Sequence, residues 1–265
     1  MKSLRLLGLS LVLALAPSAA FADDAAFFKE RLGDTYAEAS PVDKIVMLSV
    51  AKADKKFKDY KERQRVQAEV DAVVLAEVKK GKDSTEKLAI LGKIRKEGAA
   101  LVKELTTARR KEKKSYVSFS EPSSGMQGAL AMSFVADVAG PAPTIEKLAC
   151  LKQVREATSW TSHSSLILGY VTDALARDEA YGKANHEGKL DTIKKIAVDM
   201  QALSDQERKY LDHAVLADWI STELKAGKSP GDLLLAVEGL KKSQKICWFA
   251  SSWASGLIKE LANVR

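Results

Sequence analysis

The sequence predicts an all-α protein built from antiparallel helical hairpins. The chain is rich in Ala, Leu, Lys and Glu, which are good helix formers, and its apolar residues recur at intervals of three and four. Residues typical of helix starts and stops flank several of these stretches. Of the 265 residues, 46% are hydrophobic and 29% are charged, which excludes disordered, collagen-like and disulfide-dense classes.

Stripes of apolar residues at helical spacing mark the expected helices. Each stripe would lie on one face of a helix and be buried against a neighbour. The stripes are Val66, Val70, Val74 and Val78; Leu130, Phe134 and Val138; Leu168, Val171 and Leu175; Leu211, Val215 and Trp219; and Ile246, Phe249, Trp253, Leu257 and Leu261. The last stripe predicts a terminal helix that closes the core, or alternatively a helix that docks on a partner or a membrane surface.

Capping signals indicate several helix ends. Ser40 comes before Pro41, and Ser204 comes three residues before Glu207, both of which are typical of helix N-termini. Thr144 stands before a further expected start. The glycines expected at helix stops are Gly81, Gly182 and Gly227.

One type of stripe recurs along the chain and suggests a repeat. Its starts are 43, 60, 42 and 44 residues apart. Units of roughly 43 residues would be the two-helix hairpins of a short α-solenoid, because one hairpin cannot bury its stripe alone. An irregular helical bundle gives similar spacings, so both architectures stay open. The five copies are Ile45, Leu48 and Ala51; Leu88, Leu91 and Ile94; Leu148, Leu151 and Val154; Leu190, Ile193 and Ile196; and Leu234, Val237 and Leu240.

The first 22 residues have the pattern of a cleavable signal peptide. Lys2 and Arg5 give a positive start. The apolar run at 6–16 is too short to cross a bilayer as a helix, and Ala20-Phe21-Ala22 offers a small-residue cleavage site. We expect cleavage after Ala22 and export to the periplasm or the medium, with no integral membrane segment afterwards. A membrane-anchoring helix is the alternative.

The mature chain is expected to form two helical lobes. Residues 23–110 would form the N-terminal lobe and residues 128–265 the C-terminal lobe, both of plausible domain size. Residues 111–127 begin with a basic run, alternate Tyr116 and Phe119 like a short strand, and end in Ser, Pro and Gly. This composition predicts a linker or an irregular segment.

The charge balance bounds the choice of partner. The whole chain carries a formal net charge of +7, and removal of Lys2 and Arg5 would leave +5. A mildly basic surface favours an anionic envelope polymer or an envelope protein as partner. It lacks the concentrated charge of a nucleic-acid binder, so no nucleic acid is expected.

Two cysteines, Cys150 and Cys247, form an even count in a chain expected to reach an oxidising compartment. They are therefore predicted to form a disulfide. Both have apolar neighbours in sequence, so a pair of buried thiols is the alternative.

The densest basic cluster is the best candidate for binding. It comprises Arg109, Arg110, Lys111, Lys113 and Lys114, with Tyr116 close behind. Such a cluster can hold phosphate or carboxylate groups while the ring stacks on a sugar or base. The alternative is a helix whose terminal cations complement its dipole. Trp248 lies beside serines in the last helix and is the second candidate for an exposed binding ring.

Glu121 is the one candidate catalytic acid. The run from Ser120 to Gly128 resembles lysozyme-like lytic enzymes, in which a Glu heads the site and a Gly-Leu-Met-Gln run follows. The resemblance implies cleavage of peptidoglycan by a carboxylic acid. It covers fewer than ten residues, lacks the Leu, and leaves only four residues from Glu121 to Gly125.

No metal site or cofactor is predicted, because His163, His186 and His213 lack ligand spacing with one another or with a Cys. No acid, base and nucleophile converge in the sequence. We therefore expect a non-catalytic helical adaptor, scaffold or chaperone-like binding protein. The alternatives are the Glu121 hydrolase and a small-molecule carrier with a pocket between helices.

Overall fold

The computed structural model describes residues 20–140 and 142–263, and these residues form an all-α protein, as predicted. No β-strand occurs within those ranges. The helices are α1 (Ala20–Leu32), α2 (Thr35–Glu38), α3 (Pro41–Ala53), α4 (Tyr60–Val78), α5 (Ser84–Lys111), α6 (Ser124–Ala139), the 3-10 helix η1 (Ile145–Cys150), α7 (Leu151–Ala157), α8 (Trp160–Arg177), α9 (Glu179–Lys183), α10 (His186–Lys194), the π-helical turn η2 (Lys195–Asp199), α11 (Asp205–Lys225), α12 (Pro230–Lys242) and α13 (Trp248–Asn263).

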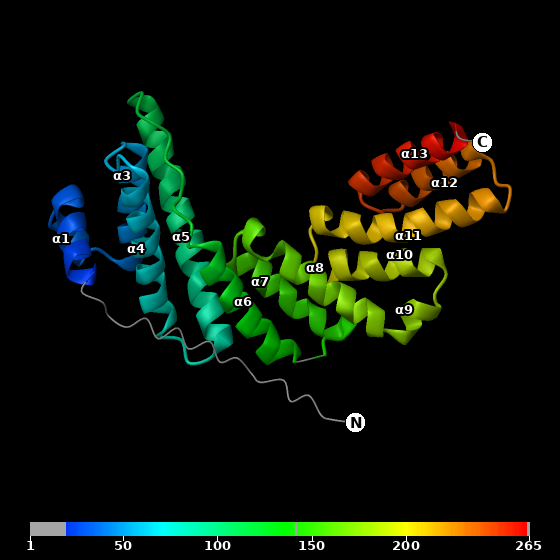
Figure 1. Ribbon diagram of the computed structural model, residues 1–265, viewed down its shortest axis with the longest axis horizontal. Helices are drawn as coiled ribbons and strands as arrows, with labels where there is room; N and C mark the ends of the chain where they lie inside the picture. Colours follow the sequence, from blue (N-terminus) through cyan, green and yellow to red (C-terminus); the bar gives the residue numbers. More distant parts are fainter. Residues whose placement is uncertain (1–19, 141, 264–265) are drawn as a thin grey trace.

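The helices stack largely in chain order into an elongated, curved array (Figure 1). Helices α3, α4 and α5 pack together at one end, and α11, α12 and α13 pack together at the other. Helix α5 also contacts α6 and α7, which join it to α8. Most contacts therefore connect elements that are close in the chain, as both a helical bundle of hairpins and a solenoid would give.

The apolar stripes are largely buried. All four valines of α4 lie in the core, as do the stripe residues of α3, α5, η1–α7 and α10–η2. Of the predicted α6 stripe, Phe134 is buried whereas Val138 is 46% exposed. Ser40 and Ser204 cap α3 and α11, and Ser204 forms the predicted capping box with Glu207. Gly227 has φ +90°, a conformation that favours glycine, just after α11.

The helices that carry the recurring stripe are unequal in length. They have 28 residues in α5, 7 in α7, 9 in α10 and 13 in both α3 and α12. In α12 the core residues are Leu233 and Val237, while Leu234 and Leu240 are only partly buried. The true repeat therefore stays a prediction.

The face of α13 that closes the core differs from the predicted one. Ala250, Ala254 and Ile258 are fully buried, whereas Phe249 and Trp253 are each 36% exposed. Small alanine side chains allow α13 to lie close to α11 and α12, which places the large rings at the edge of the contact. The predicted stripe is therefore only partly correct as the buried face: Ile246 is buried and Leu257 and Leu261 pack partly on the core, whereas Phe249 and Trp253 do not lie in it.

Residues 112–123, which we call the strap, return along α5 as an irregular segment that is exposed up to Tyr116 and contacts the rest of the fold from Val117 onward (Figure 1). Val117 is buried, and its carbonyl accepts a hydrogen bond from the Thr106 hydroxyl at 3.1 Å. Ser49 of α3 accepts one from the Ser120 amide at 2.9 Å. Phe119 packs over Gly98, where a Cβ atom would lie 2.3 Å from the ring. The segment is irregular, as predicted, and its Tyr116–Phe119 alternation forms no strand. One continuous hydrophobic core extends from α1 to α13, and the division into two lobes stays a prediction.

The predicted disulfide between Cys150 and Cys247 is wrong in this structure, where both are free, buried thiols. Cys150 ends η1, which packs against α6, α7 and α8, whereas Cys247 precedes α13, which packs against α11 and α12. The pairing was predicted from the expected oxidising compartment, and a compartment does not determine which helices lie close enough for a disulfide.

Residues 1–19 of the predicted signal peptide lie outside the described residues, and residues 20–22 form the start of α1. Within the described ranges, no helix combines the length and apolar character needed to cross a membrane.

Candidate functional site

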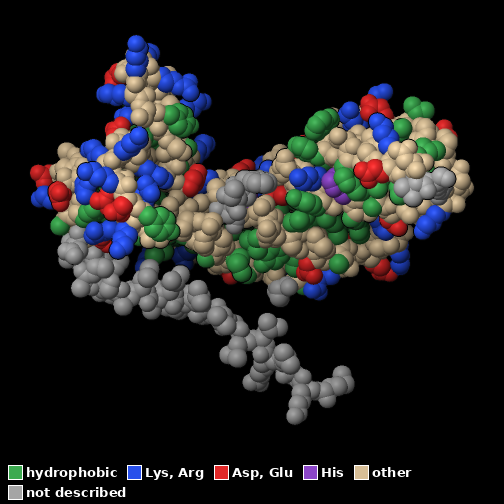
Figure 2. Space-filling view, turned by 45° about the horizontal axis from the view of Figure 1, so that its top comes forward, with side chains coloured by type: hydrophobic (Ala, Val, Ile, Leu, Met, Phe, Trp, Pro, Cys, Tyr) green, Lys and Arg blue, Asp and Glu red, His purple; other side chains and the backbone are tan. Residues whose placement is uncertain are grey.

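The most highly charged part of the molecule is the end at which α3 stops, α4 begins and α5 stops. We call residues 52–63 and 109–116 the basic tip. Figure 2 shows Lys and Arg side chains gathered over the projecting end of the molecule. The tip therefore combines the predicted cluster after Arg109 with a second basic run that the α3–α4 connection supplies.

The basic tip holds eleven Lys and Arg against four Asp and Glu, a net charge of +7. This equals the formal charge of all 265 residues, so the remainder of the chain is neutral overall. Nine of the cations have no ion-pair partner within the described ranges. These are Lys52, Lys55, Lys56, Lys58, Lys61, Arg63, Arg110, Lys111 and Lys113.

Arg109 supports the tip rather than presenting a free charge. Its guanidinium pairs with Asp54 beyond α3 and donates a hydrogen bond to the carbonyl of Ser115 at 3.1 Å, and its side chain is only 12% exposed. A small hydrophobic cluster of Val46, Val102 and Val117 joins α3, α5 and the strap. The C-terminal ends of α3 and α5 are thus held together before any ligand binds, which reduces the entropy that the protein would lose on binding.

Two exposed rings flank the cations. Tyr60, the first residue of α4, is 68% exposed, and Tyr116 on the strap is 67% exposed. Lys114 is partly neutralised by Glu112, whose pKa it lowers by a hydrogen bond and by its charge. Exposed aromatic rings among cations can stack on the rings of a polymer whose charged groups the cations hold.

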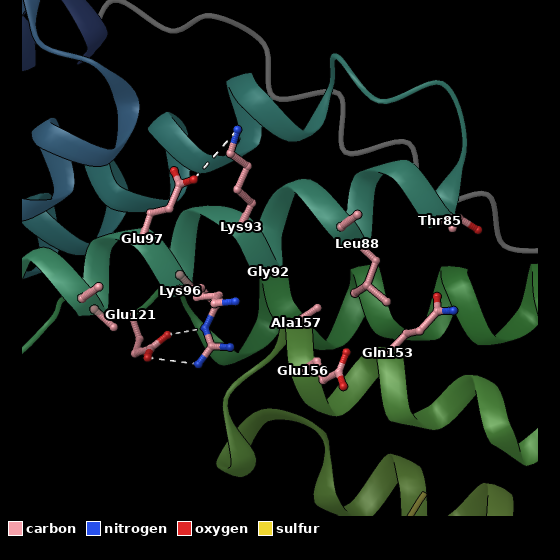
Figure 3. A pocket seen from close by; sticks show the side chains of 14 residues that line it. Thr85, Leu88, Gly92, Lys93, Lys96, Glu97, Glu121, Gln153, Glu156 and Ala157 are labelled. Carbon is pink, nitrogen blue, oxygen red and sulfur yellow. Dashed lines mark hydrogen bonds and ion pairs between the residues drawn. The ribbon is translucent and has the colours of Figure 1, made fainter. Parts of the chain in front are cut away.

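A cleft of about 1100 Å³ runs along α5 on the side of α7 and contains the candidate acid Glu121 (Figure 3). Arg95 donates hydrogen bonds to both carboxylate oxygens of Glu121, with Nε 2.6 Å from Oε2 and Nη2 3.1 Å from Oε1. Both carboxylate oxygens are therefore engaged by Arg95. This geometry is that of an ion pair linking the strap to α5, so it supplies no support for the hydrolase.

His163 is buried, and a hydrogen bond fixes its ring. Its Nδ1 lies 2.6 Å from the Thr158 hydroxyl, which also lies 2.6 Å from the carbonyl of Val154. A hydroxyl has one proton, and the carbonyl needs it, so Nδ1 must donate to Thr158. Burial lowers the pKa of His163, while the nearby charge of Glu207 opposes this shift. A buried, neutral ring of this kind stabilises a helix junction.

The other histidines are dispersed. His186 contacts Asp218 at 2.9 Å, and His213 stacks on Trp253. Across the described parts of the chain, no three His, Cys, Asp or Glu side chains gather where they could share a metal ion.

The structure thus brings together Arg110, Lys111, Lys113 and Tyr116 on an exposed surface and sets Trp248 apart, at the start of α13, which packs on α11 and α12. Sequence reasoning missed the contribution of residues 52–63. Their six Lys and Arg among twelve residues were a visible signal, but only the fold shows that they adjoin the end of α5. In comparisons with known proteins, no family, no curated protein and no solved structure matches this chain.

Proposed function

We propose that this protein is an exported, non-catalytic binding protein that holds an anionic polymer of the cell envelope on its basic tip. The observation that supports the proposal is the charge distribution: the tip alone carries +7, and nine of its cations have no ion-pair partner in the described structure. A localised field of this size attracts polyanions and raises their association rate.

Binding would be dominated by neutralisation of the polymer's charged groups. Each group that a Lys or Arg neutralises releases a condensed counterion, so affinity falls steeply as salt rises. The rigid support beneath Arg109 presents the cations without a folding step. A chaperone-like or adaptor role would use the same surface for an acidic partner protein.

The experiment compares two variants of equal net charge. The tip variant replaces Lys55, Lys58, Lys111 and Lys113 with Gln and leaves Arg109 in place. The control variant makes the same change at four other exposed lysines without ion pairs among the described residues. They are Lys79, Lys225, Lys242 and Lys259.

Binding to immobilised polygalacturonate and polyphosphate is measured as a function of NaCl. The slope of log affinity against log salt should become shallower by roughly two to four in the tip variant, because about one counterion is lost per missing contact. The control variant should elute with the wild type. Equal elution of all three proteins would contradict the proposal.

Export is tested separately. Mature protein recovered from the periplasm or the medium should begin at Asp23 when its N-terminus is sequenced. Recovery of full-length protein from the cytosol would remove the envelope from the proposal, whatever the tip binds.

A further inference from the structure

A second surface, at the start of α11 and of α13, exposes aromatic rings around one lysine. We call it the aromatic cluster. Trp248 is 61% exposed and Tyr210 is 56% exposed. The core face of α13 consists of Ala250, Ala254 and Ile258, so closure of the core does not require these rings. The members are Lys209, Tyr210, His213, Trp248, Phe249 and Trp253.

The rings hold one another in place. The ring of Trp248 meets that of Phe249 edge-on, with centroids 5.3 Å apart. Trp253 is stacked on His213 at 4.2 Å with planes only 20° apart, so one face of the indole is covered and its plane is set. Aromatic surfaces oriented before binding lose little side-chain entropy when a ligand packs on them.

Lys209 adds a charge to the same surface. Its Nζ lies 5.0 Å from the ring centre of Tyr210 and 5.8 Å from that of Phe249. It is hydrogen-bonded to Gln206 at 3.0 Å but has no carboxylate partner within the described ranges. A half-buried ammonium group among rings is therefore complementary to an anion.

The charges nearby restrict that anion. Asp205 and Glu207 lie in the first turn of α11, on either side of Gln206. One lysine matches the single charge of a carboxylate, whereas a phosphate or an anionic lipid surface brings more negative charge toward these acids. Ser252 is exposed between the two tryptophans along α13 and can bond a hydroxyl.

From this geometry we infer that the aromatic cluster binds a saccharide carrying a carboxylate. The apolar C–H face of the sugar ring packs on Trp248 and Phe249, and the carboxylate pairs with Lys209. The inference goes beyond the proposed function, because the cluster lies on other helices than the basic tip and needs only one or two sugar units.

The test uses trigalacturonate as the probe and galactotriose as its neutral counterpart, with binding measured by titration calorimetry. Trigalacturonate should bind the wild type about tenfold more tightly than galactotriose, since a hydrogen bond to a charged group contributes about that factor. Trp248→Ala and Lys209→Gln should each weaken trigalacturonate binding about tenfold, and Lys209→Arg should retain it. Leu235→Ala, which removes a 75% exposed side chain of α12, is the matched control.

Several outcomes would overturn the inference. They are equal affinity for the two trisaccharides, unchanged binding by Trp248→Ala, and Trp248-dependent binding to anionic phosphatidylglycerol vesicles without binding of trigalacturonate. The four-lysine tip variant should bind the trisaccharide normally. If that variant alone loses the trisaccharide, the saccharide site is at the tip, which refutes this inference and leaves the proposed function standing.

Discussion

Replacing Arg208 with Met should lower the free energy of unfolding by about 3–5 kcal/mol, the cost of leaving a buried charge without its partner. Arg208 and Asp212 lie one turn apart on α11, with Nε and Oδ2 3.2 Å apart and side chains that are 4% and 0% exposed. Removal of the guanidinium leaves the carboxylate in the core without a countercharge.

Backbone groups next to two helix ends stabilise both buried charges. Nη2 of Arg208 donates to the carbonyl of Lys245 at 2.6 Å and to that of Gln244 at 3.3 Å, just beyond the C-terminal end of α12. Oδ2 of Asp212 accepts from the amide of Cys247 at 2.9 Å, just before α13. A cation thus faces one helix C-terminus and an anion faces the next helix N-terminus, as the two helix dipoles favour.

The assay is urea unfolding followed by circular dichroism at 222 nm, with hydrogen exchange reporting on α13. Asp212→Asn should cost less, about 1–3 kcal/mol, because the amide oxygen can still accept from Cys247. A loss below about 1 kcal/mol in Arg208→Met would refute the reasoning, because it would mean that water or a shifted side chain already solvates Asp212.

The pH dependence gives an independent check. Burial raises the pKa of Asp212, and the charge of Arg208 opposes that rise. Without Arg208 the pKa should rise further, so the folded state takes up a proton more readily than the unfolded chain as the pH falls. The deficit of Arg208→Met should therefore shrink between pH 7 and pH 5.

Three further outcomes are expected. Gly98→Ala should destabilise the protein by about 1–2 kcal/mol in thermal unfolding, because displacement of the Phe119 ring outweighs the gain in helix propensity; in a Phe119→Ala background the same change should stabilise it. His163→Gln should flatten the loss of unfolding free energy as the pH falls below about 6.5, since burial lowers the pKa of His163 and the unfolded chain binds the proton first; an unaltered slope would show that the ring is hydrated. Cys150 and Cys247 should both react with Ellman's reagent in urea and neither rapidly in the folded state, where burial raises the pKa of Cys247 to about 11; two oxidised sulfurs would restore the disulfide.

The sequence is sufficient to predict the all-α class and the interior of most helices. The four valines of α4 recur at intervals of four, and that spacing alone places them on one buried face. The cap at Ser204 is also predictable from the sequence, because a capping box involves only residues three apart.

Features that depend on distant partners were not predictable. The core face of α13 depends on how closely Ala250 and Ala254 approach two other helices, and the larger side chains one position earlier, at Phe249 and Trp253, dominate the apolar periodicity of the sequence. The strap looked like a linker because its contacts with Ser49 and Gly98 are made across the fold. For the candidate site, the cluster at 109–114 was visible, but the neighbouring run at 52–63 required the packing of α3 on α5.

The length of α5 determines how far from the start of this helix the basic tip would hold the proposed polymer. Its 28 residues span about 42 Å, more than twice the length of α3 beside it. In the proposed function, the polymer would lie at this end of α5, and shortening α5 by whole turns would bring it closer to the start of the helix by about 5.4 Å per turn.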